Sequence, residues 1–217
     1  MSILKFFIIL IAIILSKISY AHQPEEGKVF GTLGGFLNHT QAIYTSEAPY
    51  SRFNPGFGLL AEGDISSHGG LEIGLFYFLK TYKREFGVNG LVVANVDKID
   101  IPMGYRYWLS PQLSGAVAFS SSFSVGDSFV SYSNVVGDQS TSASNITDYG
   151  FDFSVQWEFW TNNVFSLLLD GRYSLSISSN LGEDANTYGI LVGLKYLIQE
   201  KYDDSKEREE KPLDKTQ

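Results

Sequence analysis

Apolar and polar side chains alternate without a break along residues 147–160, which read TDYGFDFSVQWEFW. Successive side chains of a β-strand point to opposite faces, so this segment predicts one strand with an apolar face and a polar face. It is longer than the usual soluble strand of about five or six residues. It suits a tilted strand that crosses a bilayer, which takes about 9–11 residues.

Seven more segments alternate in the same way, and the connections between them are long and short in turn. The eight predicted strands are residues 28–38, 56–65, 70–82, 94–109, 113–125, 147–160, 164–177 and 187–198. Residues 39–55, 83–93, 126–146 and 178–186 are the long connections. The pattern predicts an all-β fold, an eight-stranded antiparallel up-and-down transmembrane barrel with short periplasmic turns and long outer loops.

The alternation alone does not say which face is inside, since a soluble lipocalin-like barrel would also alternate. Two features favour a lipid-facing apolar side. The polar face is rich in small residues, such as the Ser and Ala row of 113–125, which suit the narrow interior of eight strands. The aromatic residues of the apolar face gather near strand ends, as at membrane interfaces. Leu167 is expected near the bilayer midplane.

The remaining segments predict an exported protein. Lys5, the apolar run 6–15 and the small-x-small sequence 19–21 predict a signal peptide over residues 1–21. A polar leader is expected at 22–27, the barrel at 28–199, and a disordered, charged periplasmic tail at 200–217. The 217 residues include no cysteine and carry 24 acidic against 16 basic side chains. This balance argues against nucleic acid as a partner.

A family resemblance appears in residues 104–113, which read GYRYWLSPQL. This segment resembles the periplasmic hairpin of small bacterial outer-membrane barrels of the OmpA/OmpX type. Thr187, Gly189, Val192 and Leu194 also fit the polar-x-Gly-x-x-apolar-x-apolar signal by which such barrels are recognised for assembly. The resemblance implies location in the bacterial outer membrane, contact with its lipids and lipopolysaccharide, and insertion by the barrel assembly machinery.

The predicted interior carries both signs of charge, which must be paired where they are buried. We expect a structural network in the lumen made by Glu62, Glu72, Lys80, Lys98, Asp100, Arg106, Asp152, Glu158, Asp170, Arg172 and Lys195. Arg106 and Glu158 both lie near short turns, and the small residues of 113–125 separate their strands. A direct Arg106–Glu158 pair, or a network that includes both, is therefore predicted. Pro102 cannot donate to a ladder, which predicts a bulge or local break there.

The sequence shows no catalytic constellation, cofactor motif or metal-ligand pattern, so none of these is expected. His39 is the only histidine placed for acyl chemistry on lipid, and it is interpreted as a surface-loop residue without a role. The leading hypothesis is a non-enzymatic outer-membrane barrel with a plugged lumen and a structural or surface-interaction role. A surface partner would contact the outer loops. The alternatives are a small channel for ions or apolar solutes and a lipid-modifying enzyme.

Overall fold

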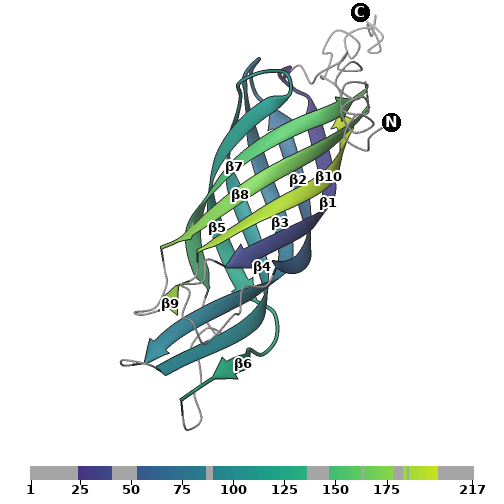
Figure 1. The fold of residues 1–217 in the computed structure, drawn as a ribbon. Helices are drawn as coiled ribbons and strands as arrows, with labels where there is room; N and C mark the ends of the chain where they lie inside the picture. Colours follow the sequence, from purple (N-terminus) through teal and green to yellow (C-terminus); the bar gives the residue numbers. More distant parts are fainter. Residues whose placement is uncertain are drawn as a thin grey trace, which may run out of the picture.

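The computed structural model describes residues 24–40, 53–86, 90–135, 147–162, 164–177, 183–184 and 186–199. In this part of the chain, eight long antiparallel strands close into a barrel (Figure 1). Each pairs with its neighbour along the chain, and β1 (Val29–Thr40) pairs with β10 (Thr187–Gln199) to close the ring. The predicted fold class is confirmed.

The other barrel strands follow the predicted order. They are β2 (Phe53–Asp64), β3 (Gly69–Phe86), β4 (Gly90–Trp108), β5 (Leu113–Ser124), β7 (Asp148–Thr161) and β8 (Phe165–Ser176). Two short strands lie outside the ring: β6 (Phe129–Ser133) pairs with β4, and β9 (Glu183–Asp184) pairs with β3. Val29 pairs with Gln199, so the barrel begins and ends at the same rim.

The apolar face of each strand points outward. On β7, Phe151, Phe153 and Val155 are 40%, 44% and 58% exposed, whereas Asp152 and Gln156 are buried. Exposed apolar side chains cover the barrel wall in the same way on the other long strands. A soluble monomer rarely exposes an apolar surface of this extent, which indicates that lipid covers it. No described helix is long and apolar enough to span a membrane.

Two girdles of aromatic residues bound the apolar wall. Towards the short turns lie Tyr105, Tyr107, Trp157, Trp160, Phe165 and Tyr196, and towards the opposite rim lie Tyr77, Tyr149, Tyr173 and Tyr188. Leu167 is only two residues from Phe165, so the expectation that it lies at the midplane is wrong. Val192 is midway between Tyr188 and Tyr196 on β10 and is the better midplane residue.

Two irregularities interrupt the ladders. The β3–β4 pairing lapses between Ile73↔Met103 and Phe76↔Asp100 without changing register, so Pro102 produces the local break and no bulge. On β7 the register against β8 shifts between Glu158 and Trp160. Phe159 is the extra residue, and Trp160 takes the outward position that the strict alternation had assigned to Phe159.

The connection predicted over 83–93 is wrong. β3 and β4 continue as a hairpin from Lys80↔Val96 to Phe86↔Gly90, beyond the last residue pairs that join them to β2 and β5 (Figure 1). Gly90 lies within the predicted connection, but it begins β4. Paired backbones satisfy each other's hydrogen bonds, so two strands can continue past the barrel rim together. We call residues 79–86, 90–97 and 129–133 the projection.

The leader packs against the barrel where it is described. Gly27 adopts φ 92° in a turn, and its backbone N–H donates to the Asp64 carbonyl at 2.9 Å. The Glu25 N–H also donates to the Asp64 carboxylate at 3.2 Å. Residues 24–28 are thereby tied to the end of β2. The predicted signal peptide at 1–21 and the tail at 200–217 lie outside the described residues.

Candidate functional site

The lumen holds all eleven charged residues that the sequence placed in the interior network. Each has an exposed fraction of 5% or less. They come from β2, β3, β4, β7, β8 and β10, and they divide into two groups. The turn-side network contains Glu62, Glu72, Arg106, Glu158, Asp170, Arg172 and Lys195. The loop-side network lies where the projection joins the barrel and contains Lys80, Lys98, Asp100 and Asp152, with Asp148.

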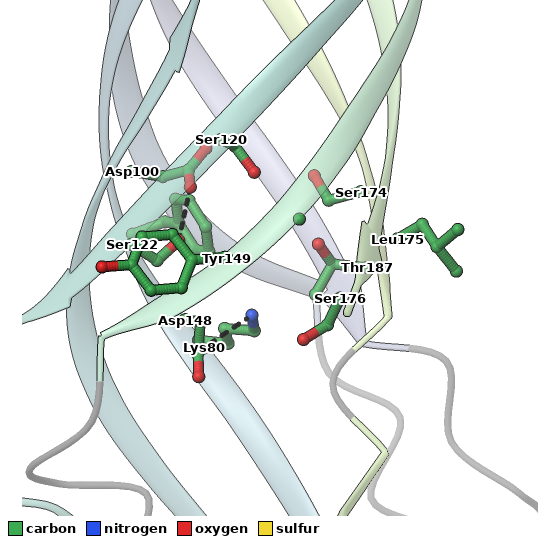
Figure 2. Close-up of a pocket in the computed structure, with 12 residues that line it drawn as sticks. Lys80, Asp100, Ser120, Ser122, Asp148, Tyr149, Ser174, Leu175, Ser176 and Thr187 are labelled. Carbon is green, nitrogen blue, oxygen red and sulfur yellow. Dashed lines mark hydrogen bonds and ion pairs between the residues drawn. The ribbon is translucent and has the colours of Figure 1, made fainter. Parts of the chain in front are cut away.

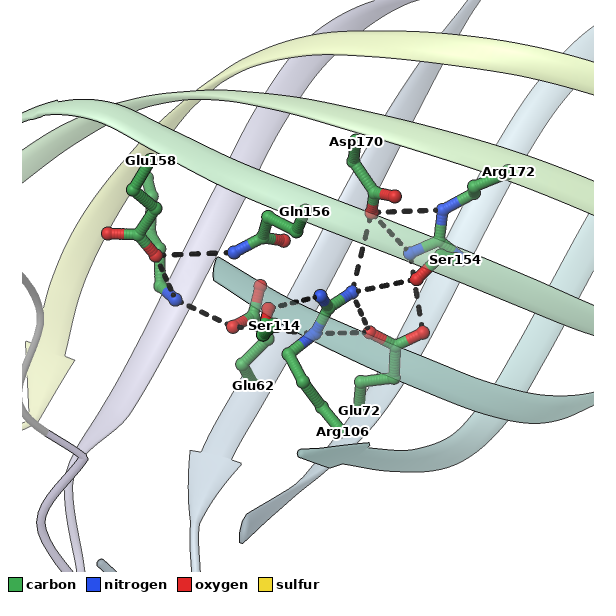
Figure 3. A network of polar contacts seen from close by, with 10 residues as sticks. Glu62, Glu72, Arg106, Ser114, Ser154, Gln156, Glu158, Asp170 and Arg172 are labelled. Atoms are coloured by element: carbon green, nitrogen blue, oxygen red, sulfur yellow. Dashed lines mark hydrogen bonds and ion pairs between the residues drawn. The ribbon is translucent and has the colours of Figure 1, made fainter. Parts of the chain in front are cut away.

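Glu72 joins the two guanidinium groups of the turn-side network (Figure 3). Its Oε2 accepts from Arg106 Nη2 at 2.6 Å and Nε at 2.9 Å, and its Oε1 accepts from Arg172 Nη2 at 3.3 Å. Asp170 Oδ2 accepts from both guanidinium groups, at 2.8 Å from Arg172 and 3.4 Å from Arg106. Two carboxylates and two guanidinium groups therefore share hydrogen bonds across strands β3, β4 and β8.

Lys195 extends this network towards the barrel end. Its ammonium group donates to Glu62 at 2.6 Å and to Glu158 at 2.9 Å, and lies 4.7 Å from the ring centre of Trp108. Arg106 is 3.9 Å from Glu62. No described contact joins Arg106 to Glu158 directly, so the direct pair is wrong. The alternative holds, because Glu62 and Lys195 link the two residues within one network.

Small residues on β5 and β7 make room for these long side chains. Ser114 accepts a hydrogen bond from Arg106 at 2.8 Å, and Ser154 accepts another at 3.2 Å. Ala116 lies between Ser114 and Ala118 on the inward row of β5, and both alanines are buried. The Ser and Ala row therefore leaves space through which Arg106 crosses the lumen.

An apolar layer packs inside the barrel, and on β3 its residues lie between Glu72 of the turn-side network and Lys80 of the loop-side network. It consists of Phe36, Leu60, Phe76, Phe78, Leu168 and Leu191, all buried. The Phe36 ring packs edge-on at 5.1 Å from Phe76 and 5.5 Å from Phe78. Phe76 also receives the Arg172 guanidinium over its face at 4.8 Å. Sequence reasoning missed this layer, although apolar residues at inward positions of the strands were its signal.

Glycines accommodate the rings of this layer. A Cβ added at Gly58 would lie 2.6 Å from the Phe76 ring, and one at Gly189 would collide with the Phe36 ring. Real Cβ atoms do not approach other atoms so closely. Glycine at these inward positions therefore lets the aromatic rings lie flat against the wall of a narrow barrel.

The loop-side network surrounds Asp148, which sequence reasoning left out of the site. Lys80 and Lys98 lie 3.5 and 3.2 Å from its carboxylate, and the Tyr82 hydroxyl donates to it in a short hydrogen bond. Ser122 donates to Asp100. A hollow of about 10 Å³ lies among these residues, lined also by Ser120, Ser174, Ser176 and Thr187 (Figure 2).

His39 is not a loop residue, contrary to the sequence interpretation. It lies on β1 and is 5% exposed. Its ring stacks on Tyr188 at 4.8 Å and packs against Phe53 at 5.1 Å. The imidazole is thus part of the aromatic packing at the rim. Among the described residues, no group of three or more His, Cys, Asp or Glu is arranged to hold a metal ion.

Comparisons with known proteins agree with this architecture. No protein-family model matches the sequence, and no curated protein matches it. Among solved structures, OprG from Pseudomonas aeruginosa superimposes with a TM-score of 0.56 at 10% identity, over 83% of this chain and 99% of that chain. Ail, the attachment invasion locus protein of Yersinia pestis, gives a TM-score of 0.47 at 11% identity, over 80% and 100% of the two chains.

The likeness to OprG is one of fold. Together with the lipid-facing wall and the filled interior, it defines the class of protein: an eight-stranded transmembrane β-barrel of the outer-membrane type.

Proposed function

We propose that this protein is a non-enzymatic barrel of the bacterial outer membrane that presents the projection at the cell surface, while its lumen stays closed. The observation that carries this proposal is the filled cross-section. Six apolar side chains pack together in the lumen beside a network of ion pairs, in a barrel whose strand number leaves little spare lumen. Such an interior supports a structural or surface-interaction role better than solute transport.

The projection supports the surface role. β3 and β4 stay paired for eight positions beyond the last residue pairs that join β3 to β2 and β4 to β5, which is about 27 Å along the strands at about 3.4 Å per residue. Val92, Ala94 and Val96 are fully buried within it, while Phe129 and Val130 on β6 are 54% and 46% exposed. A packed base and an exposed apolar strand suit contact with another surface, and loops of barrels commonly carry such contacts.

Conductance tests the closed lumen. Purified protein inserted into a planar bilayer should give no steady ionic current, because the apolar layer offers charged solutes no solvation. The double variant Phe36→Ala and Phe76→Ala removes the two rings at the centre of the layer and should produce measurable current. Large steady current from the unmodified protein would contradict the proposal and support the small-channel alternative.

That alternative has one observation in its favour. The apolar layer draws its side chains from β1, β2, β3, β8 and β10, whereas β4, β5 and β7 face it with Asp100, Ser120 and Asp152. A narrow polar path for small ions could follow this side of the lumen. Cation-selective current that disappears in Asp152→Ala would identify such a path.

Cysteine labelling tests location and orientation, since the chain has no native cysteine. Ser131→Cys on β6 should react with a membrane-impermeant maleimide on intact cells, because Ser131 is exposed on the projection. Ser110→Cys in the turn between β4 and β5 should react only after the outer membrane is opened. Labelling of Ser110→Cys in intact cells would reverse the proposed orientation.

A further inference from the structure

The projection and the mouth of the barrel share one polar cluster. Lys80 and Tyr82 belong to the projection, Lys98 follows it on β4, and Asp148 is the first residue of β7. All four side chains are buried, with exposed fractions of 8% or less. We call these four residues the latch. Because β4 and β5 lie between β3 and β7 in the ring, the contacts of the latch cross the mouth of the barrel.

Asp148 is the acceptor on which the latch depends. Its Oδ2 accepts the short hydrogen bond from the Tyr82 hydroxyl, and it lies 3.2 Å from the Lys98 ammonium and 3.5 Å from that of Lys80. Both ammonium nitrogens lie 5.4 Å from the centre of the Tyr82 ring, a distance at which cation–π attraction acts. One carboxylate on β7 therefore holds three side chains at the base of the projection.

A second contact positions the projection from the side of β2. Residue pairing between β2 and β3 ends at Phe78. Beyond it, the Asn54 side-chain amide donates to the Leu79 carbonyl at 3.1 Å and to the Thr81 hydroxyl at 3.3 Å. The projection is thus held on two sides, by Asn54 at the rim and by Asp148 across the mouth.

The latch lies at one end of the hollow of about 10 Å³ in the loop-side network. Lys80 and Asp148 line this hollow together with Asp100 and Ser120. Figure 2 shows Lys80 and Asp148 at one end of it and Asp100 and Ser120 at the other. Ser120 pairs with Gly150, which is further along β7 than Asp148 and so deeper in the barrel. The latch is therefore the mouth end of the hollow.

We propose that the latch couples the projection to the lumen. While Asp148 holds Lys80, Tyr82 and Lys98, the projection keeps one orientation and the hollow is closed; displacement of the projection breaks these contacts and opens the hollow to the mouth. Buried ammonium and carboxylate groups are stable together and costly apart, so the latch favours two discrete positions over a gradual opening. The inference rests on the proposed function only for placing this mouth at the cell surface.

Access to the hollow provides the first test, since the chain has no native cysteine. Ser120→Cys places a thiol at the inner end of the hollow, at a position that is 5% exposed. In purified full-length protein in lipid nanodiscs, the neutral reagent methyl methanethiosulfonate should modify this thiol about tenfold faster when Tyr82→Phe or Asp148→Asn is also present. Either change weakens buried hydrogen bonds of the latch and so favours local opening. Asp127→Asn, in the exposed turn between β5 and β6, is the matched control and should leave the rate unchanged.

The position of the projection is measured in the same variants. Spin labels at Ser131→Cys on β6 and Ser110→Cys in the turn between β4 and β5 report the distance from the projection to the opposite end of the barrel. The distance distribution should be narrow with the latch intact and should broaden in Tyr82→Phe. This variant keeps the aromatic ring, so it tests the latch even if Asp148→Asn does not fold.

Two results would overturn the proposal. An unchanged rate at Ser120→Cys in Tyr82→Phe would show that the latch does not close the hollow. A faster rate with an unchanged distance distribution would show that the hollow opens without the projection. Neither measurement depends on which rim faces the cell exterior, so failure of the latch is distinguishable from failure of the surface role, which labelling of intact cells tests.

Discussion

The variant Arg106→Met should lower the free energy of unfolding in lipid vesicles by about 3–5 kcal/mol, the typical cost of breaking a buried ion pair from one side. Arg106 is 1% exposed and donates to Glu72, Asp170, Ser114 and Ser154. Its removal leaves Glu72 with Arg172 alone inside a barrel that excludes water. Unfolding in urea, monitored by tryptophan fluorescence, measures this loss of free energy.

Double-mutant cycles identify the carboxylate that pairs with Arg106. Arg106→Met combined with Glu72→Gln should be milder than the sum of the single changes by about 1–3 kcal/mol, because the two side chains share hydrogen bonds. Arg106→Met combined with Glu158→Gln should show a smaller coupling, since Glu62 and Lys195 lie between them. A larger coupling with Glu158 than with Glu72 would refute this arrangement of the network.

The variant Val192→Arg should cost about 2–4 kcal/mol of barrel stability, which is the penalty for a charge facing lipid at the bilayer midplane. Val192 is 53% exposed on the outer wall and lies midway between the girdle residues Tyr188 and Tyr196 on β10. Unfolding in vesicles by urea measures the penalty.

Ile198→Arg is the matched control on the same strand. Ile198 is 61% exposed and lies beyond Tyr196, at the edge of the apolar wall. The same charge there should cost only about 0–1 kcal/mol, because the side chain reaches the interface. Equal penalties at the two positions would show that the girdles do not mark the bilayer boundaries.

The sequence predicted which residues face the lumen better than it predicted which of them contact one another. Alternation assigned Glu72, Arg106 and Asp170 to the interior, because the face to which a side chain of a strand points depends only on local backbone geometry. It could not assign Arg106 to Glu72, because long side chains cross the lumen and their contacts depend on register and tilt. Asp148 was seen on the polar face of its strand but omitted from the site. Its role depends on Lys80 and Lys98, which are distant in sequence.

By itself, the sequence determined the strand number, the lipid-facing side and the ring order, since these follow from local alternation and from connection lengths. Only the tertiary structure decided the rest. Phe36 and Phe76 belong to the apolar layer because five strands bring inward apolar side chains into one cluster. β3 and β4 continue into the projection because each supplies the other's backbone hydrogen bonds. Lys80 meets Asp148, and Arg172 meets Asp170, because the geometry of the lumen rather than the number of charges selects which groups can meet.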